Sequence, residues 1–399
     1  MFNKRTIKRL TMLSLTSICF ANLNSITVSA VSKTPIFNSE NVLLEPSDPF
    51  VMPEDYPSEL QEWYDQNMDA RSYVVIDQET NKVLAEKEAN VSYPIASMTK
   101  ILSMYMIYKA LDEGTISMDQ EIEIPAEIVQ DISSNENLSN VWLVEGVAYP
   151  IKDLMYAVMI QSANDATSAL MWEIYGSEQA AVQAMQDQLT EWGITNAQLY
   201  STSGAPNNEV PESWWIPGST IDSENTMAAA DVALMAQHTI EEYPQILEIA
   251  STKEYAFMEG HPEEAQILYN TNQLLEGGSY EREGITGLKS GFTDAAGLNF
   301  TATGSQNDRN FISVAMGTFG EGMSSYWETE ILLDGLLDHP EVYDLDLPTN
   351  LRTPSTDELV ADSDNEESED TVIEENPPVE NNRDNAITNF MRDLFGIFN

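Results

Sequence analysis

The apolar positions of the chain predict strands at the two ends of one long segment and helices between them. Near its start, residues 73–76 and 82–85 are short aliphatic runs separated by a turn-rich spacer, as in a β-hairpin. Near its end, residues 286–290 predict a strand, and residues 298–302 and 311–315 predict a second hairpin. This order favours an α+β fold, in which helices flank one antiparallel sheet.

The intervening segment has the apolar spacing of helices. A long helical pattern begins at Ser97 and ends near Gly114. Further helices are predicted at 151–160, 164–175, 180–193, 223–242 and 328–337. Residues 201–222 are rich in Gly, Pro and Asn and predict a long loop, whose Trp214 and Trp215 we expect to pack against the domain.

Composition divides the chain into five segments. Residues 31–69 contain several prolines and one short helical stretch at 58–67, and residues beyond 353 are rich in Asp and Glu. We predict a signal peptide at 1–30, a lead segment at 31–69, a single domain at 70–345, a disordered acidic linker at 346–385 and an amphipathic helix at 386–399.

The first thirty residues have the layout of a secretory signal peptide. Residues 4–9 are basic, residues 10–20 are apolar, and Val28-Ser-Ala30 supplies the small residues of a cleavage site. The apolar run is short for the alternative, an uncleaved membrane anchor. Cys19, the single cysteine, lies inside this segment, so we expect an exported protein without disulfides or thiolate-bound metal.

Charge and histidine content exclude several classes of function. The chain has 66 Asp and Glu against 18 Lys and Arg, a formal charge of −48, whereas nucleic-acid binding needs clustered Lys and Arg. We therefore expect no nucleic-acid partner. His238, His261 and His339 lie outside any nucleophile motif and lack metal-ligand spacing, so we predict neither a Ser-His-Asp triad nor a metal site, and no cofactor.

Three short motifs carry the candidate chemistry. Ser97-Met-Thr-Lys100 is the only Ser-x-x-Lys of the chain, and Ser162-Ala-Asn164 and Lys289-Ser-Gly291 follow it in that order. A serine hydroxyl is a weak nucleophile and needs a base. Lysine can be that base if burial or a nearby positive charge destabilises its ammonium form. Three residues span about one helical turn, so Ser97 and Lys100 would share a face.

In this order the motifs are the signature of class A β-lactamases and penicillin-binding proteins. The residues around the three motifs resemble a narrower group, the serine D-alanyl-D-alanine carboxypeptidases, which are the low-molecular-mass penicillin-binding proteins of peptidase family S11. The resemblance spans about 70–345 and is carried by residues 71–77, 94–100, 160–166 and 287–297. Two departures are Ala163, where many relatives have Gly, and Ser290, where many have Thr.

The resemblance implies a β-lactamase/DD-peptidase-like fold and a mechanism. Neutral Lys100 would activate Ser97 for attack on the penultimate D-Ala of a peptidoglycan stem peptide ending in D-Ala-D-Ala, and β-lactams would acylate the same serine. Ser162 would relay a proton to the departing D-Ala, while Asn164 would position Lys100 and the peptide. Backbone N–H groups of Ser97 and Phe292 would bind the oxyanion.

The same resemblance implies the substrate-binding residues Lys289, Ser290, Gly291, Phe292 and Thr293. Lys289 would hold the terminal carboxylate, helped by the hydroxyls of Ser290 and Thr293, and would help to keep Lys100 deprotonated. The site would act at the cell wall or at the outer face of the bacterial membrane, where residues 386–399 would lie in the membrane surface. A protein partner for this helix is the alternative. The second, β-rich domain of many relatives is expected to be missing.

Three other functions share parts of this pattern. A β-lactamase needs a dedicated glutamate for deacylation, but the Glu-x-x-Leu-Asn pattern between the second and third motifs is missing. A DD-endopeptidase that cuts wall cross-links is closer in sequence. A non-catalytic wall-binding relative would not need intact Ser97, Lys100 and Lys289.

Overall fold

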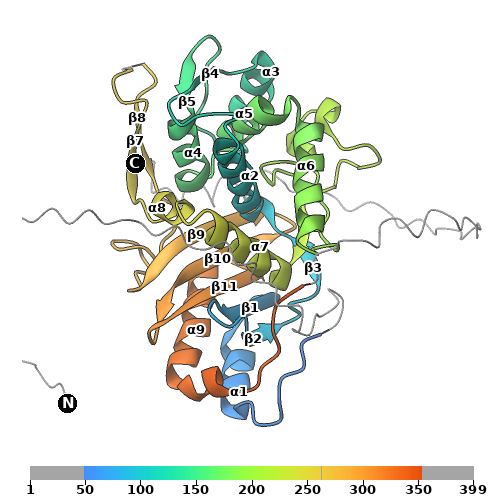
Figure 1. Cartoon of the computed structure of the whole chain (residues 1–399), viewed down its shortest axis with the longest axis vertical. Coiled ribbons are helices and arrows are strands. Elements are labelled where there is room, and N and C mark those ends of the chain that lie inside the picture. Colours follow the sequence, from blue (N-terminus) through green and yellow to red (C-terminus); the bar gives the residue numbers. More distant parts are fainter. Residues whose placement is uncertain (1–48, 262, 353–399) are drawn as a thin grey trace, which may run out of the picture. The chain divides into compact units, whose positions relative to one another are not determined.

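The computed structural model describes residues 49–261 and 263–352 (Figure 1). The predicted signal peptide, the first part of the lead segment, the acidic linker beyond residue 352 and the C-terminal helix lie outside the described residues. Among the described residues, no helix is both long and apolar enough to cross a membrane.

A five-stranded antiparallel sheet forms the centre of the fold, as the hydrophobic pattern predicts. Its strands lie in the order β2-β1-β11-β10-β9. Val74 pairs with Val314, so the N-terminal hairpin is joined to strands from the end of the domain. The strands are β1 (Ser72–Asp77), β2 (Val83–Lys87), β9 (Ile285–Thr293), β10 (Gly297–Gln306) and β11 (Arg309–Thr318).

The second hairpin is longer than predicted because its turn is tighter. Strand β10 continues to Gln306 and β11 begins at Arg309, which leaves a loop of Asn307 and Asp308. Both loop residues have positive φ, 54° and 59°. Two such residues match the right-handed twist of the flanking strands, and Asn and Asp tolerate this conformation better than most side chains.

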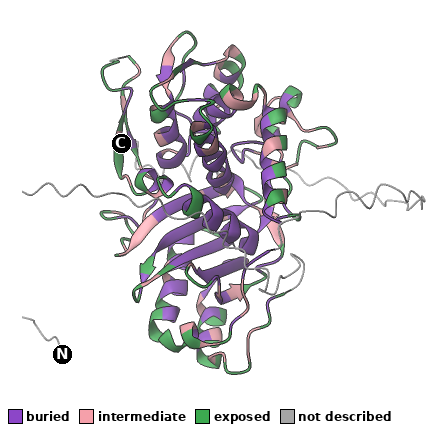
Figure 2. Ribbon diagram, in the orientation of Figure 1, coloured by how far each residue is buried: buried purple, intermediate pink, exposed green. Residues whose placement is uncertain are grey.

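Helices cover both faces of the sheet, so strand β1 is buried along its whole length (Figure 2). Val74 and Ile76 belong to the larger hydrophobic core, with the helices that follow the nucleophile motif. Tyr73 and Val75 belong to a second core on the opposite face, under α1 (Ser58–Asn67) and α9 (Ser325–Asp338). Alternate residues of a strand point to opposite faces, which explains the division.

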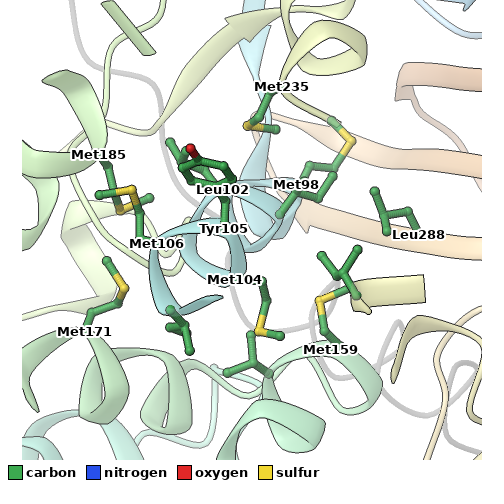
Figure 3. Close-up of a cluster of buried hydrophobic side chains, with 14 of the residues drawn as sticks. Met98, Leu102, Met104, Tyr105, Met106, Met159, Met171, Met185, Met235 and Leu288 are labelled. Carbon is green, nitrogen blue, oxygen red and sulfur yellow. The ribbon is translucent and has the colours of Figure 1, made fainter. Parts of the chain in front are cut away.

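Helix α2 (Lys100–Asp112) runs through the larger core. Methionines surround it in Figure 3, among them Met159, Met171, Met185 and Met235 from neighbouring helices. Flexible thioether side chains fill irregular gaps between helices of different direction. The neighbours are α4 (Ile151–Ile160), α5 (Asn164–Tyr175), α6 (Glu178–Glu191) and α7 (Ala229–Glu242).

Most predicted helices agree with these bounds within a few residues, and α7 is the main exception. It begins at Ala229 and not at Ser223, because Thr226–Ala228 forms strand β6 and pairs with β3 (Ser92–Pro94). The predicted packing of Trp214 is confirmed, since it is buried and its ring centroid lies 4.6 Å from that of Trp172.

The elements that the periodicity missed are short. Besides β3 and β6, they are β4 (Glu121–Glu123), β5 (Ala148–Pro150), β7 (Glu254–Phe257), β8 (Gln266–Tyr269), α3 (Ala126–Ile128), α8 (Ile246–Ala250), the π-helical turn η2 (Val129–Ser133) and the 3₁₀ turns η1 (Ala96–Thr99), η3 (Asn207–Glu209), η4 (Glu212–Trp214) and η5 (Pro340–Asp344). Elements of three to five residues are too short to display a hydrophobic period.

The packed domain extends beyond the predicted limits of 70–345 at both ends. Helix α1 buries Leu60 and Tyr64 completely, and the Tyr64 hydroxyl donates to the Leu332 carbonyl at 2.9 Å. At the other end, Arg352 and Asp231 form a buried ion pair at 3.2 Å. The first part of the predicted acidic linker therefore belongs to the folded domain.

Leu60→Ala is expected to lower the free energy of unfolding of the full chain by about 2–5 kcal/mol, because it leaves a cavity in the second core. The control Glu62→Ala, at an exposed position of the same helix, should change it by less than about 0.5 kcal/mol. Urea unfolding followed by tryptophan fluorescence measures both. Equal stability of the two variants would remove α1 from the cooperative domain.

Candidate active site

The structure brings Ser97 and Lys100 together at the entrance to α2. Ser97 lies in the turn η1, and Lys100 is the first residue of the helix. Lys100 Nζ lies 2.9 Å from Ser97 Oγ. Lys100 is fully buried whereas Ser97 is partly exposed, so the hydroxyl is open to a ligand and the amine is shielded from water.

Two carbonyl groups complete the surroundings of the Lys100 amine. Nζ lies 2.9 Å from Asn164 Oδ1 and 2.7 Å from the Ser203 carbonyl oxygen. A neutral amine has two N–H donors and one lone pair. If the donors are directed to the two carbonyl groups, the lone pair faces the Ser97 hydroxyl, which can then donate to it.

The environment of Lys100 favours this neutral form. Burial lowers the pKa of Lys100 well below its ordinary value of 10.5, and the positive charge of Lys289 lowers it further. The Asp165 carboxylate opposes both effects. Burial is the largest of the three influences, so the amine is positioned as a base by its removal from water.

Asn164 is held in one orientation by the backbone of a neighbouring loop. Its N–H and its Nδ2 both donate to the Ser139 carbonyl oxygen, at 2.7 and 2.9 Å. With the amide nitrogen engaged there, Oδ1 faces Lys100. Buried Asp165 fixes the same loop, since it accepts hydrogen bonds from the N–H groups of Val141 and Leu143, each at 3.2 Å.

Ser162 lies in the connection between α4 and α5, where the sequence placed it. Its φ is +60°, a left-handed conformation that is uncommon for residues other than glycine. It is almost completely buried and lines a cavity of about 70 Å³ together with Ser97, Ser290 and Gly291. Unusual backbone conformations of this kind concentrate at functional sites.

Strand β9 brings the third motif to the nucleophile. A Cβ atom on Gly291 would lie 2.7 Å from the Ile95 carbonyl oxygen and 3.1 Å from the Ser97 nitrogen. Only glycine permits this approach. Gly204 serves the same purpose on the other side, because a Cβ atom there would lie 2.0 Å from the Ala96 carbonyl oxygen.

Lys289 precedes Ser290 on strand β9 and is buried, but it lines neither of the two cavities beside Ser97. Its side chain is 1% exposed, and Nζ donates to the Ser290 carbonyl oxygen at 3.1 Å. Burial lowers the pKa of Lys289 to about 7. Ser290 itself lines the smaller cavity, and its hydroxyl lies 3.2 Å from that of Thr271.

Thr293 follows Phe292 at the end of strand β9. It lines a second, larger cavity of about 120 Å³ that also reaches Ser97, and not the cavity that contains Ser290. Its hydroxyl donates to Glu224 Oε2 at 2.6 Å. Phe292, between Ser290 and Thr293 on β9, lines both cavities. The hydroxyls of Ser290 and Thr293 therefore lie on opposite sides of Ser97.

The three histidines lie away from the Ser97–Lys100 pair. His238 stacks on Trp192 with ring centroids 4.6 Å apart, and burial lowers its pKa to about 4. His261 and His339 line neither of the two cavities beside Ser97. Within residues 49–261 and 263–352, no three His, Cys, Asp or Glu side chains gather closely enough to hold a metal ion.

The sequence motifs missed the backbone groups of the site. The carbonyl oxygens of Ser203 and Ser139 contact Lys100 and Asn164, but a carbonyl group leaves no signature in a sequence. Glu224 was also missed, because its contact with Thr293 joins residues that are far apart along the chain.

Comparison with known proteins agrees with this geometry. The family model for D-alanyl-D-alanine carboxypeptidases, peptidase family S11, matches residues 59–320. A solved structure of a peptidoglycan synthesis regulatory factor, PBP3 of Streptococcus pneumoniae, is 33% identical with a TM-score of 0.63, and the alignment covers 67% of this chain and 71% of that one.

Two curated relatives are similar over a comparable length. D-alanyl-D-alanine carboxypeptidase DacF of Bacillus subtilis is 28% identical over 249 residues, which cover 62% of this chain and 57% of the relative. D-alanyl-D-alanine carboxypeptidase DacA of Escherichia coli is 29% identical over 252 residues, 63% of this chain and 56% of the relative. The chain thus spans somewhat more than half the length of these relatives. Since the family match includes α1, all three motifs and the whole sheet, the protein belongs to the D-alanyl-D-alanine carboxypeptidase family, peptidase S11.

Proposed function

We propose that this protein is a serine D-Ala-D-Ala carboxypeptidase, which removes the terminal D-Ala of peptidoglycan stem peptides through an acyl-enzyme on Ser97. One observation carries the proposal: buried Lys100 Nζ lies 2.9 Å from Ser97 Oγ while two carbonyl groups accept its N–H donors. An activated nucleophile needs a base within hydrogen-bond distance, and this pair meets the requirement.

In the first step Lys100 takes the proton of Ser97 as Oγ attacks the carbonyl carbon of the penultimate D-Ala. The oxyanion that forms is bound by the backbone N–H groups of Ser97 and Phe292. Both residues line the larger cavity and the smaller one, so the reacting carbonyl lies where the two meet. The polar Asn164 side chain also lines the larger cavity and positions the acyl part of the peptide.

In the second step the bond between the two D-Ala residues breaks. The departing amine receives the proton through Ser162, and the terminal carboxylate lies near Lys289 and Ser290. A bound carboxylate raises the pKa of Lys289, so the lysine is charged in the complex although burial lowers its pKa in the free enzyme. Water then hydrolyses the ester on Ser97 and restores the enzyme.

β-Lactams are covalent inhibitors under this proposal, because their strained amide presents the same carbonyl and carboxylate to the site. The basic and apolar residues of 1–30 support export, which brings the enzyme to the peptidoglycan outside the cytoplasmic membrane. The apolar stripe of residues 386–399 supports an in-plane contact with the outer face of that membrane.

Ser97→Ala is expected to abolish labelling by a fluorescent penicillin and to reduce D-Ala release from diacetyl-Lys-D-Ala-D-Ala by about 10³-fold or more, because the nucleophile is lost. Ser117→Ala, at an exposed position, should keep both. Continued D-Ala release by the Ser97 variant would refute the proposed acyl-enzyme. In the wild type, a label without D-Ala release would favour an endopeptidase, and rapid loss of the label a β-lactamase.

The stability gap between the wild type and Lys100→Met should change with pH. The folded pKa of Lys100 is lower than the unfolded value of 10.5, so between these values the unfolded chain binds a proton that the folded protein lacks. Wild-type stability therefore gains up to about 1.4 kcal/mol per pH unit as the pH rises from the folded pKa towards the unfolded one, and the Met variant lacks this gain. Urea unfolding at several pH values measures the gap, and a constant gap would mean that folded Lys100 is charged.

Deletion of residues 386–399 is expected to release the protein from membranes without reducing D-Ala release from a soluble peptide, because the apolar stripe is lost and the site is retained. Flotation with anionic lipid vesicles measures the binding. A deletion of equal length in the acidic linker, residues 366–379, is the control and should leave binding intact. If the first deletion left binding unchanged, the helix would not be the anchor.

A further inference from the structure

The larger of the two cavities beside Ser97 has an acidic wall that the proposed acyl-transfer chemistry does not use. Three carboxyl side chains line it, those of Glu209, Glu224 and Asp294. Asn164 and Ser97 belong to the same lining, so these carboxylates face the space next to the reacting group. The cavity measures about 120 Å³, enough for an aliphatic side chain with a polar end.

The described partners of these carboxylates are uncharged. Glu209 accepts hydrogen bonds from the Asn135 and Asn137 side chains, each at 3.1 Å, and Glu224 accepts from Thr293. The ion pairs found in residues 49–352 involve other acids, so the wall keeps its negative charge. Burial raises the pKa of Glu224, and the charge of nearby Asp294 raises it further. A cationic ligand would lower this pKa again, because it favours the charged carboxylate.

The direction of strand β9 determines which part of a peptide reaches this wall. Ser290 lines the smaller cavity, where the terminal carboxylate binds in the proposed function, and Lys289 precedes it on the strand. A strand advances about 3.3 Å per residue, so Thr293, the last residue of β9, lies about 10 Å beyond Ser290, and Asp294 follows it. An extended peptide of two residues beyond the carboxylate covers most of this span, and a side chain covers the rest.

The site therefore has opposite charges at its two ends. Lys289 is a buried cation next to Ser290, which lines the smaller cavity, and the carboxylates form the wall of the larger one. This arrangement complements a ligand with a carboxylate at one end and a cation at the other. Because the nucleophile lies between the two cavities, the cation belongs to the residue that precedes D-Ala-D-Ala.

We infer that the larger cavity binds a free primary ammonium on the side chain of the residue before D-Ala-D-Ala, with Glu224, Glu209 and Asp294 as its carboxylate partners. This inference rests on the proposed function. It names the substrate class as stem peptides whose third-position amine is not acylated. Peptides in which that amine is part of a cross-link carry a neutral amide there and are poorer substrates.

The test compares three peptides with the full mature chain. Nα-acetyl-Lys-D-Ala-D-Ala carries the free ammonium, Nα,Nε-diacetyl-Lys-D-Ala-D-Ala carries an amide, and Nα-acetyl-norleucyl-D-Ala-D-Ala has the aliphatic chain without the amine. The kcat/KM for D-Ala release is expected to be about tenfold or more higher for the first peptide, since partly desolvated charge pairs contribute strongly to binding. Added salt should reduce this preference and leave the two neutral peptides nearly unchanged.

Isosteric variants connect the preference to the cavity. Glu224→Gln keeps an acceptor for the Thr293 hydroxyl and Asp294→Asn keeps its shape, so both remove charge without removing volume. Each is expected to reduce the preference severalfold, and the double variant to bring it within about twofold. The matched control is Glu212→Gln. Glu212 is an exposed acid in the loop 201–222 and does not line the cavity, so this variant should keep the wild-type preference.

The outcomes separate this inference from the proposed function. Equal cleavage of all three peptides by the wild type would overturn the ammonium site and leave the carboxypeptidase intact. A preference that survives in the double variant would overturn its assignment to this cavity. Labelling by penicillin without D-Ala release from any peptide would overturn both.

Discussion

The burial of one amine, that of Lys100, is the constraint on which the rest of the site depends. An unpaired ammonium is costly to remove from water, and the positive charge of Lys289 adds to the cost. The fold does not relieve this cost with a carboxylate in contact; it provides the carbonyl oxygens of Asn164 and Ser203, which a neutral amine also satisfies. The surroundings thus select the protonation state that a base needs.

The carbonyl of Ser203 is held in place by a buried carboxylate. Glu178 accepts hydrogen bonds from the Thr202 N–H at 2.7 Å and from the Trp172 indole at 3.0 Å. The Ser103 hydroxyl, one turn beyond Lys100, donates to the Thr202 carbonyl. Helix α2 is therefore hydrogen-bonded to two successive carbonyl groups, those of Thr202 and Ser203. The position of the loop that contains them follows that of the helix. Precise placement of this kind is what proximity requires in catalysis.

The sequence was informative where a pattern repeats or where a motif is local. The sheet and the helix bounds followed from periodicity, and the approach of Lys100 to Ser97 followed from their three-residue spacing. What it could not supply were contacts across long separations, such as Glu224 with Thr293, and the burial of Leu60 on a helix of mostly polar composition. These depend on how elements pack, and neither a local motif nor a hydrophobic period encodes that.

Strand β9, at the edge of the sheet, explains how one site combines a fixed Ser97–Lys100 pair with walls that can vary. Strand β9 pairs with β10 on one side, and on the other it faces the turn of Ser97 at Gly291. Any larger residue there would displace the nucleophile from Lys100, so this contact leaves no freedom for change. In the walls beyond it, the Ser290 hydroxyl is hydrogen-bonded to Thr271 and Glu224 to Thr293, not to the Ser97–Lys100 pair. Selectivity can therefore differ at the two ends of the proposed peptide substrate while the geometry of the Ser97–Lys100 pair stays the same.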